Sequence, residues 1–582
     1  MFRANMVYWK RINATVKKGR EGMKQAIKLP IGVEDFRKLR TEGYYFVDKT
    51  RFIRALLAGH ADVTLFARPR RFGKTLSLSM VEAFFSQQHR DEAMHLFAGT
   101  EIASDTAVMR EAGSKPVLFL SLKDIEADHF TQMLAAFARK MAVTYLRFPA
   151  IKTSLQPAEQ AYWERVEWQQ ASLVDLQDSL RSLLEFMVRH TGKKVLLLID
   201  EYDAPIQQAW AHGYYQEAID FFRPFLSAAL KTNPALDFAL ITGVLRIAKE
   251  SIFSGLNNLE VSTVLSGGYA DVFGYTRREV EQIAKDFDCM AQLPEIASWY
   301  DGYAFQGVDI YNPWSVNNYF RQDCKAAKYW ANTSGNTILA QLLHDADKAR
   351  WQDLQALMDG RSIVAGVDEN VIYGSIDTDE AALYTLLLLT GYLKAVRTVD
   401  EESGLYELSI PNQEVRRAYR TEILSRFGGG EKDPSLYKMF QAMTNGDAQA
   451  FEEYLQKIIL RTVSLYDAAR PESFYHGLML GFTLYYEKDY RVVSNLESGY
   501  GRLDLALFPH HRGMPGILME FKAVKQEDKL DAAVKKALTQ IQERAYTTQL
   551  QESGAEKIWC YGIAFCRKQV VVRLSERTTR YE

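Results

Sequence analysis

Two short motifs in the N-terminal half contain residue types that bind phosphate and magnesium. The first, ARPRRFGKT at residues 67–75, ends in Gly73, Lys74 and Thr75 and lies between an apolar run and an amphipathic stretch. A glycine-containing loop before a helix turns backbone N–H groups toward phosphates, its lysine reaches the terminal phosphate oxygens, and its hydroxyl meets Mg²⁺. The loop residues expected to contact a nucleotide are Arg70, Arg71, Phe72, Gly73, Lys74 and Thr75.

One residue of this loop departs from the general pattern. Arg68 stands where the usual loop has its first glycine. Arginine pays a steric penalty at this position if φ is positive, because its Cβ crowds the backbone. We therefore expect the loop either to be shaped differently or to bind phosphate less tightly.

The second motif, KKVLLLIDEYD at residues 193–203, is an apolar strand that ends in Asp200 and Glu201. Asp200 would hold Mg²⁺ through water, and Glu201 would polarise the attacking water as the catalytic base. A buried strand with a solvated acidic end is the plain alternative, and a GKT tripeptide recurs by chance. The order of the two motifs, about 125 residues apart, favours a nucleotide site.

A further strand-like run ends in residues suited to the same chemistry. It reaches Thr242, where a polar group that senses the γ-phosphate would stand, and it continues into GVLRIAKES. Arg246 in that segment could sense phosphate or act in trans on a neighbouring subunit, which would require a homo-oligomer. A surface cation that follows a strand is an equally good interpretation of Arg246.

A second constellation lies near the C-terminus. Asp504 is followed, after fifteen residues, by Glu520, Phe521 and Lys522. Residues two apart on a strand point to one face, so Glu520 and Lys522 would face Asp504 on an adjacent strand. The carboxylates would hold one or two Mg²⁺ ions that activate water, and Lys522 would stabilise charge on the reacting phosphate. Glu472, on a preceding apolar helix, could add a metal ligand.

An E-x-K tripeptide alone carries little information, because it arises often on solvated faces in a chain that is 25% charged. Here Met519, Phe521 and Ala523 alternate with the two charged residues, which puts both charges on one face of an apolar strand. Burying such a pair is costly unless it serves a site. His476, on the same helix as Glu472, could contact phosphate or fill the core.

Buried strands and helices alternate in the N-terminal half, as a parallel sheet covered on both faces requires. The four strand candidates are residues 63–67, 117–122, 195–199 and 238–242. Residues 271–350 are helical and aromatic-rich with few strand signals, and we expect their aromatic side chains to pack in a core rather than to stack bases. An apolar helix at 384–389 precedes two short strand-like pieces, an order that would fit a winged helix. The last 110 residues read as helix, three strands, helix and two strands.

Composition excludes several classes of protein. A chain of 582 residues with 47% apolar and 25% charged residues is an ordinary globular sequence of several domains, not a disordered, collagen-like or disulfide-scaffold protein. The net charge of −2 neither supports nor excludes a nucleic-acid partner. The four cysteines lack metal-ligand spacing, and we expect free thiols in a reducing compartment.

No segment has the length and apolarity of a membrane span. The longest apolar stretch, residues 381–393, is far shorter than the roughly 20 residues that a bilayer needs. We therefore expect a cytoplasmic protein with no membrane partner. Residues 1–28 hold eight cations against one acid, and they could be a transit peptide, a nucleic-acid arm or a segment upstream of a true start at Met23. A solvated tail or a mis-chosen start is the simpler interpretation.

Eight longer motifs carry a resemblance to a known family. They are LPIGVEDF, YYFVDKT, LFARPRRFGKTLSLSM, LLLIDEYDAPI, ITGVLRIAKESIFSGLNNL, WYDGYAF, YNPWSVNNYF and YWANTSGN. From Leu29 to about Val572 the chain resembles the bacterial AAA-ATPase-like family, whose members usually carry a C-terminal PD-(D/E)XK nuclease domain. The resemblance implies a P-loop ATPase core that uses ATP and Mg²⁺, and its working residues would be Lys74, Thr75, Asp200 and Glu201. The family itself carries arginine in the RPRRFGKT loop.

From these observations we expect an α/β protein with four parts. They are a basic extension at residues 1–28, a P-loop ATPase domain with a parallel sheet at 29–270, a helical or lid region with a winged helix at 271–430, and a restriction-endonuclease-like α/β domain at 431–582. Glycine, charge and proline gather at residues 427–434, which suggests a hinge before the last domain.

The expected function couples the two constellations. ATP hydrolysis would gate or position metal-dependent cleavage of a nucleic acid, with DNA preferred to RNA as the partner. One alternative is an ATP-switched signalling or interaction protein whose C-terminal domain binds nucleic acid without cutting it. Another is a nucleotide-binding protein with negligible hydrolysis.

Overall fold

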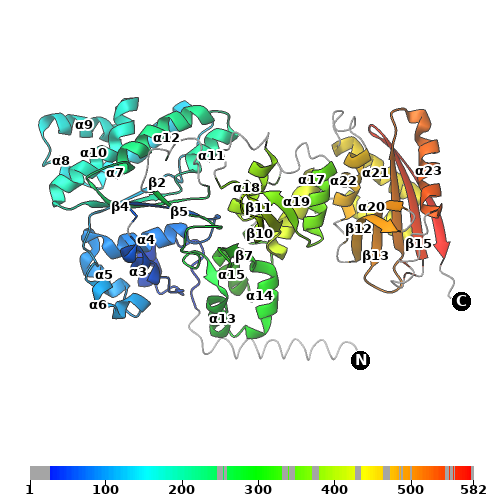
Figure 1. Cartoon of the computed structure of the whole chain (residues 1–582), viewed down its shortest axis with the longest axis horizontal. Coiled ribbons are helices and arrows are strands. Elements are labelled where there is room, and N and C mark those ends of the chain that lie inside the picture. The colour runs from blue at the N-terminus through cyan, green and yellow to red at the C-terminus, as the bar shows by residue number, and fades with distance from the viewer. Residues whose placement is uncertain are drawn as a thin grey trace, which may run out of the picture. The chain divides into compact units, whose positions relative to one another are not determined.

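The computed structural model divides the chain into two compact units (Figure 1). One unit comprises residues 1–330 and 366–391, and the other comprises residues 331–365 and 392–582. The structure describes residues 27–59, 61–245, 253, 259–330, 339, 348–369, 379–426, 434–462, 472–483, 486, 489–498, 501–543, 550, 555 and 557–578. Most of the basic extension and the expected boundary at residue 430 lie outside these ranges, and the expected domain bounds stay predictions. No helix within the described ranges is long and apolar enough to cross a membrane.

A five-stranded parallel sheet forms the core of the first unit. Its strand order is β2-β3-β4-β1-β5, and all four neighbouring pairs are parallel. The strands are β1 (Val63–Ala67), β2 (Val117–Ser121), β3 (Val195–Asp200), β4 (Leu236–Gly243) and β5 (Leu259–Ser262). The four strands predicted from apolar runs are confirmed, and β1 and β3 are buried along their whole length. The sequence LEVS of β5 was missed because it carries a charge and is mostly half-buried.

Helices cover both faces of this sheet (Figure 1). One face carries α7 (Phe130–Leu146), α8 (Pro149–Lys152), α9 (Pro157–Glu167), α10 (Leu173–Thr191), α11 (Ala204–Ala211) and α12 (Tyr215–Leu230). The opposite face carries α3 (Arg51–Ala58), α4 (Lys74–Phe85), α5 (Arg90–Leu96) and α6 (Thr106–Met109), and α2 (Phe36–Thr41) packs on α4.

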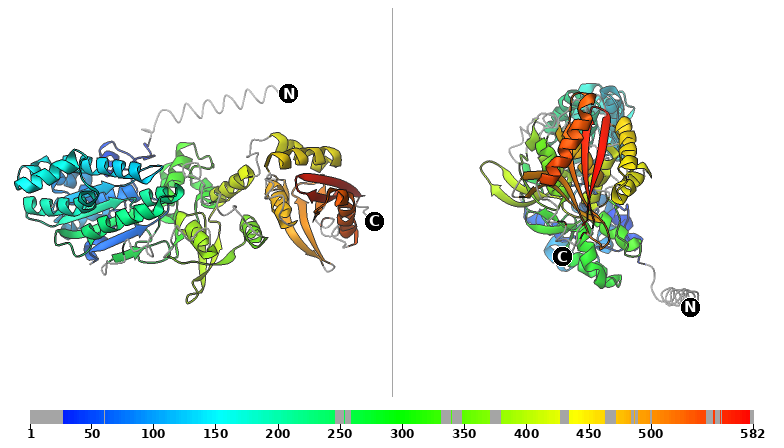
Figure 2. Two further views of the ribbon diagram at one scale, coloured as in Figure 1. Left: turned by 90° about the horizontal axis from the view of Figure 1, so that it is seen from above. Right: turned by 90° about the vertical axis from the view of Figure 1, so that its right-hand side faces the viewer.

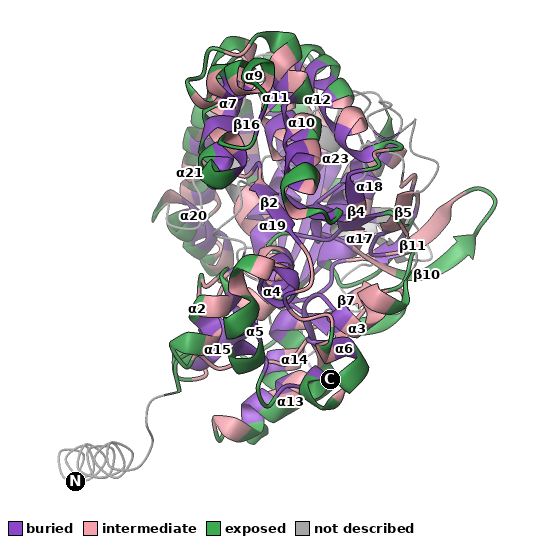
Figure 3. Ribbon diagram, turned by 90° about the vertical axis from the view of Figure 1, so that its left-hand side faces the viewer, coloured by how far each residue is buried: buried purple, intermediate pink, exposed green. Residues whose placement is uncertain are grey.

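The local sequence explains where these helices begin and end. In α10, a capping box of Ser172 and Asp175 satisfies the first free N–H groups, and Gly192 ends the helix with a left-handed φ of 70°. Its buried leucines, such as Leu180 and Leu184, recur at helical spacing. Buried residues accordingly concentrate along the sheet and on the helix sides that face it (Figure 3).

An aromatic subdomain follows the parallel sheet within the first unit. The short strands β6 (Tyr275–Thr276), β7 (Tyr303–Phe305) and β8 (Val308–Tyr311) form an antiparallel sheet of order β6-β8-β7. The helices are α13 (Arg277–Asp286), α14 (Leu293–Tyr300) and α15 (Pro313–Arg321). The sequence carried few strand signals here because strands this short show no alternation. The packing interpretation of the aromatic residues is confirmed, since most of those between Trp299 and Phe320 belong to the buried core.

The cysteines need a correction. Cys289, between α13 and α14, and Cys324, shortly after α15, form a disulfide. The expectation of free thiols is therefore wrong for this pair, because residues 35 apart in sequence meet at the same end of the subdomain. The other two cysteines, Cys560 and Cys566, keep their thiols and are buried on one strand.

A small sheet and a helix follow the order expected for a winged helix. The sheet is β10-β11-β9, with strands β9 (Ile363–Gly366), β10 (Lys394–Asp400) and β11 (Leu405–Ser409). The apolar helix α18 (Glu380–Thr390) precedes β10, as predicted. The two strand-like pieces are thus confirmed as a hairpin, and most of β10 is exposed (Figure 3). The winged-helix assignment itself stays a prediction.

The C-terminal part of the second unit is a mixed five-stranded sheet in the order β12-β13-β14-β15-β16. Its strands are β12 (Tyr490–Ser498), β13 (Gly501–Pro509), β14 (Gly516–Ala523), β15 (Lys557–Cys566) and β16 (Gln569–Thr578). Only β14 and β15 pair in parallel, and α23 (Leu530–Glu543) makes the crossover between them. The expected order of helix, three strands, helix and two strands is confirmed.

Helices cover both faces of this mixed sheet as well. They are α20 (Pro434–Asn445), α21 (Ala448–Thr462) and α22 (Glu472–Thr483), besides α23. Two further helices, α17 (Lys348–Met358) and α19 (Gln413–Arg426), pack on α22. The view in Figure 2 shows the sheet between α23 on one side and α20 and α21 on the other. Close packing of α23 requires Gly562, because a Cβ there would lie 2.7 Å from the carbonyl oxygen of Val534.

Candidate functional site

Three predicted residues of the N-terminal constellation meet at the carboxyl edge of the parallel sheet. Thr75 Oγ1 at the start of α4 donates to Asp200 Oδ2 at 2.8 Å, and Thr242 Oγ1 donates to Asp200 Oδ1 at 2.6 Å. The backbone N–H of Glu201 donates to Thr242 Oγ1 at 3.3 Å. Because β4 lies between β1 and β3, its last residues stand between the two motifs. Asp200 is fully buried and holds both hydroxyls in place.

The 67–75 loop is closed around its lysine. Lys74 is 4% exposed, and its ammonium donates to the carbonyl oxygens of Arg68 and Pro69, each at 2.9 Å. Burial lowers the pKa of Lys74, while the charges of Glu201, Asp203 and Asp200 raise it. Gly73 has a φ of 86°, and no atom lies within 4 Å of the position that a Cβ would take. The loop therefore keeps open space beside the first turn of α4.

Arg68 is oriented away from this space. Its guanidinium is buried and donates to the carbonyl oxygen of Ser262 at 2.7 Å and to Ser262 Oγ at 2.9 Å. The left-handed backbone positions of the loop are Arg71 and Gly73, so the steric penalty expected at Arg68 does not arise. The two expected outcomes, a different loop shape or weaker phosphate binding, both stay predictions. Burial lowers the pKa of Arg68 to about 9, although the charge of Glu369 opposes this shift.

The remaining loop residues contact the aromatic subdomain and α11. Arg70 Nη2 donates to Gln207 Oε1 at 2.6 Å, and the indole of Trp330 donates to the Arg70 carbonyl at 3.1 Å. Phe72 is buried, with its ring centroid 5.0 Å from that of Tyr303. The backbone of Phe72, rather than its ring, would therefore serve a phosphate.

Two residues that sequence reasoning missed hold the end of β4. Asp203 Oδ2 accepts from the N–H groups of Val244 and Leu245 at 2.8 and 2.9 Å. The hydroxyl of Tyr202 donates to the Leu245 carbonyl at 2.8 Å. Burial raises the pKa of Asp203. The available signal was the acid that follows the Asp200-Glu201 pair, but it resembled the solvated end of a strand. Arg246, the next residue, lies outside the described residues.

Glu201 has a backbone suited to a turn directly after a strand. Its φ is 49°, in the left-handed region, so β3 ends abruptly and the side chain leaves the strand direction. Burial raises the pKa of Glu201, and the charge of Lys74 opposes the rise. A carboxylate with a raised pKa at the edge of such a site suits a general base.

The C-terminal constellation assembles where β13 and β14 stop pairing. Their last paired residues toward this end are Leu505 and Met519. One residue further, Asp504 Oδ2 accepts from the N–H of Phe521 at 2.8 Å. Lys522 Nζ donates to Glu520 Oε1 at 2.9 Å. The structure thus brings the three predicted residues, Asp504, Glu520 and Lys522, to one place.

Glu520 is the most unusual group in this cluster. It is 1% exposed, and its second oxygen, Oε2, is buried with no hydrogen-bond partner among the described residues. Burial, together with the charge of Asp504, raises the pKa of Glu520 to about 7, although Lys522 opposes the rise. An unpartnered buried carboxylate oxygen costs free energy unless a ligand completes it.

Comparison with known proteins matches both constellations. Residues 30–253 match the family described as "Predicted AAA-ATPase", and residues 470–574 match the "PD-(D/E)XK nuclease superfamily". The chain joins an AAA-ATPase-like domain to a PD-(D/E)XK nuclease domain. It is also similar to the "Uncharacterized protein in vnfD 5'region" of Azotobacter chroococcum mcd 1, with 26% identity over 555 residues, 93% of this chain and 96% of that protein. The two families support an ATPase with a nuclease, and the second suggests a nucleic-acid substrate.

The nuclease domain offers oxygen ligands of the type that Mg²⁺ prefers. Asp504 and Glu520 supply two carboxylates, and the imidazole Nδ1 of His476 lies 3.9 Å from Asp504 Oδ1. Glu472 is the first residue of α22, and its side chain is outside the described set. Among side chains that the structure describes, no three His, Cys, Asp or Glu residues gather around one point. The unpartnered oxygen of Glu520 fits a metal at this position.

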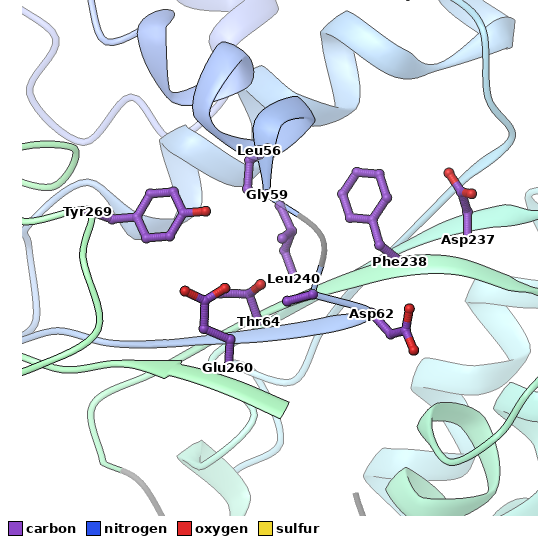
Figure 4. Close-up of a pocket in the computed structure, with 10 residues that line it drawn as sticks. Leu56, Gly59, Asp62, Thr64, Asp237, Phe238, Leu240, Glu260 and Tyr269 are labelled. Carbon is purple, nitrogen blue, oxygen red and sulfur yellow. The ribbon is translucent and has the colours of Figure 1, made fainter. Parts of the chain in front are cut away.

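A cavity in the AAA-ATPase-like domain lies at the opposite edge of the sheet (Figure 4). It has a volume of about 150 Å³ and opens at the amino ends of β1, β4 and β5, beside Asp62, Asp237 and Glu260. Asp237 is paired with Lys115 at 2.7 Å. Ligands of open α/β sheets bind outside the carboxyl ends of the strands. None of the predicted site residues lines this cavity, so it is separate from the residues expected to hold a nucleotide.

Proposed function

We propose that this chain is an ATP-dependent nuclease. Its AAA-ATPase-like domain would bind and hydrolyse ATP with Mg²⁺, and hydrolysis would gate or position metal-dependent cleavage of a phosphodiester by the nuclease domain. The observation that carries the proposal is the buried Glu520 carboxylate. Its Oε1 accepts from Lys522 Nζ, and its Oε2 has no hydrogen-bond partner among the described residues. Keeping such a group in a core is costly, and it is typical of a catalytic site.

The roles of the nuclease residues follow from their positions. Asp504 and Glu520 would hold Mg²⁺, and Glu472 could add a ligand from α22. The metal, when bound, lowers the pKa of a water molecule and stabilises charge on the leaving oxygen. Lys522 is 18% exposed and carries a positive charge beside the carboxylates, so it would stabilise charge on the reacting phosphate.

The roles in the AAA-ATPase-like domain rest on the Asp200 contacts. Thr75 and Asp200 would hold the Mg²⁺ of the nucleotide, and Glu201 would act as the base toward water. Lys74 would exchange its two loop carbonyls for phosphate oxygens. Thr242 links Asp200 to the end of β4, which suits a group that senses the γ-phosphate.

We also propose the partners and the division into domains. The nucleic acid is proposed to be DNA rather than RNA, the location cytoplasmic, and the assembly a homo-oligomer in which Arg246 acts on a neighbouring subunit. The ATPase would occupy residues 29–270, a lid with a winged helix 271–430, and the nuclease 431–582. The order and spacing of the motifs along the chain support the division into domains.

A cleavage panel tests the proposal. Purified full-length protein is incubated with single- and double-stranded DNA and RNA, with Mg²⁺ or Mn²⁺, in the presence and absence of ATP. Asp504→Ala and Lys522→Ala should abolish cleavage, and Lys74→Ala should abolish its ATP dependence. Asp528→Ala, which changes an exposed acid of the same domain, should cut normally. Wild-type protein that binds nucleic acid but never cuts it would refute the nuclease half.

The same panel separates the second candidate function, an ATP-switched protein whose C-terminal domain binds nucleic acid without cutting it. The fact that favours it is the presence of only two close carboxylates among the described side chains. ATP-dependent binding without product would support this function. Negligible ATP turnover by the wild-type protein, with or without DNA, would support a nucleotide-binding protein instead.

A further inference from the structure

A glutamate outside the two motifs pairs with cations at the carboxyl edge of the parallel sheet. Glu34 lies just before α2, and its Oε1 and Oε2 accept from Lys123 Nζ at 2.8 and 3.0 Å. Arg71 Nη1 of the 67–75 loop lies 3.9 Å from the same Oε1. The side chains of Glu34, Lys123 and Arg71 are 44%, 39% and 35% exposed, so all three are open to solvent on one side.

The strand order places Lys123 beside the residues proposed for hydrolysis. β2 pairs with β3 so that Ser121 is opposite Asp200, and the N–H of Leu122 donates to the Asp200 carbonyl at 3.0 Å. Lys123 follows directly, in a turn. Its positive charge acts on the Glu201 carboxyl, as the charge of Lys74 does from the other side.

The backbone of Arg71 has a strained conformation. Its φ is 68°, a left-handed conformation that is costly for arginine and frequent in functional loops. The guanidinium lies over the ring of Trp314, 4.4 Å from its centroid. With this backbone conformation, the Arg71 guanidinium lies near the same Glu34 carboxylate that Lys123 contacts.

The charges of the three groups do not balance. Two cations share the single carboxylate of Glu34, and Lys123 also interacts with the charge of Glu201. A triphosphate carries several negative charges and offers each cation a stronger partner than Glu34 does. Partly exposed ion pairs such as those of Glu34 are weak, so a phosphate can displace the carboxylate into solvent.

We infer that Lys123 and Arg71 are phosphate-binding cations of the nucleotide site, and that Glu34 is an internal anion that they release when a nucleoside triphosphate binds. The inference rests on the proposed function and adds Lys123 and Glu34 to the loop residues, Arg71 among them, that are expected to contact the nucleotide. Lys123 lies next to Glu201, where the γ-phosphate would stand, so it favours triphosphate over diphosphate. Glu34 competes with that phosphate and lowers the affinity of the site.

Equilibrium binding to the full-length protein tests this inference, with a non-hydrolysable ATP analogue and with ADP as probes. Lys123→Ala should weaken binding of the ATP analogue by at least about tenfold, because a charge-assisted hydrogen bond is lost, and should change ADP binding much less. Lys123→Arg, which keeps the charge, should restore most of the affinity. Glu34→Gln should tighten binding of the ATP analogue about threefold or more, because the competing charge is gone.

Two controls make the result specific. Glu185→Gln removes a carboxylate of similar exposure from an ion pair with Arg181 on α10, and it should leave both affinities unchanged. In a Lys123→Ala background, Glu34→Gln should tighten binding of the ATP analogue by a smaller factor than it does alone, because Lys123, the main partner of Glu34, is gone. Thermal unfolding of each variant should match that of the wild type.

The outcomes separate the inference from the proposed function. If the wild type binds both nucleotides while Glu34→Gln and Lys123→Ala behave like Glu185→Gln, the inference alone is overturned. The same conclusion follows if Lys123→Ala weakens binding of the ATP analogue and of ADP by the same factor. If the wild type binds neither nucleotide, the proposed function fails and the inference falls with it.

Discussion

The buried carboxylate of Asp203 leads to a prediction that depends only on hydrogen bonds of this structure. Both N–H groups that it satisfies, those of Val244 and Leu245, donate to the same oxygen, Oδ2. Asp203→Ala leaves two buried donors without a partner, at about 1–3 kcal/mol each, so the end of β4 should lose about 2–6 kcal/mol. Asp203→Asn keeps one acceptor oxygen that can serve both donors, and it should cost about 1 kcal/mol or less.

Because the chain has two compact units, a single unfolding midpoint would mix their stabilities. Amide hydrogen exchange at Val244 and Leu245 measures the local effect directly. A loss of 2 kcal/mol corresponds to about 30-fold faster exchange in Asp203→Ala. Asp220→Ala, an exposed acid on α12, should leave these amides unchanged. Equal exchange in Asp203→Ala and the wild type would show that Asp203 does not hold the segment.

Two further predictions concern the nuclease domain and a turn beside Arg68. The pKa of Glu520 is raised from 4.5 to about 7 in the folded metal-free protein, so the native state binds more protons than the unfolded state between these values and stability falls as pH rises through them. The total loss is about 3 kcal/mol. It should appear as a lower midpoint for the urea transition of the second unit at pH 7.5 than at pH 5, and Glu520→Gln should remove this difference. In the turn, Gly267→Ala should destabilise the first unit by at least about 2 kcal/mol, because φ is 87° and its Cβ would lie 2.1 Å from the Val261 carbonyl oxygen. Gly268→Ala, with φ 71° and open space, should cost less in the same denaturation assay, and equal costs would contradict the clash.

The sequence predicts the elements whose burial is complete and misses those whose burial is partial. Strand β3 is a continuous apolar run, so its position and its acidic end were predicted, whereas β5 is half-buried and β6 has two residues. The Asp200 cluster could be anticipated because carboxyl ends of neighbouring parallel strands share one edge. The Glu520 cluster could be anticipated because Glu520 and Lys522, two apart on a strand, point to one face. Their residues meet as expected, although their roles stay predictions.

Contacts that depend on strand order could not be predicted. Lys123 reaches the nucleotide edge because β2 pairs with β3, and Asp203 reaches the Leu245 amide because β4 lies on the other side of β3. Nothing in a single sequence fixes that order. The buried position of the Arg68 side chain likewise depends on Ser262 at the end of β5, a strand that the apolar pattern of the sequence did not predict.

The two compact units are interleaved along the chain, and this has a consequence for synthesis. The chain leaves the first unit after Trp330, returns for residues 366–391, and then leaves again. The returning segment contains α18, which buries nearly all its side chains, and Gly391, whose Cβ would lie 3.2 Å from Pro69 of the 67–75 loop. A growing chain that has reached residue 330 therefore lacks some of the residues that pack against its 67–75 loop. Because domains generally fold in order as they emerge, the first unit can complete its packing only after part of the second has been made.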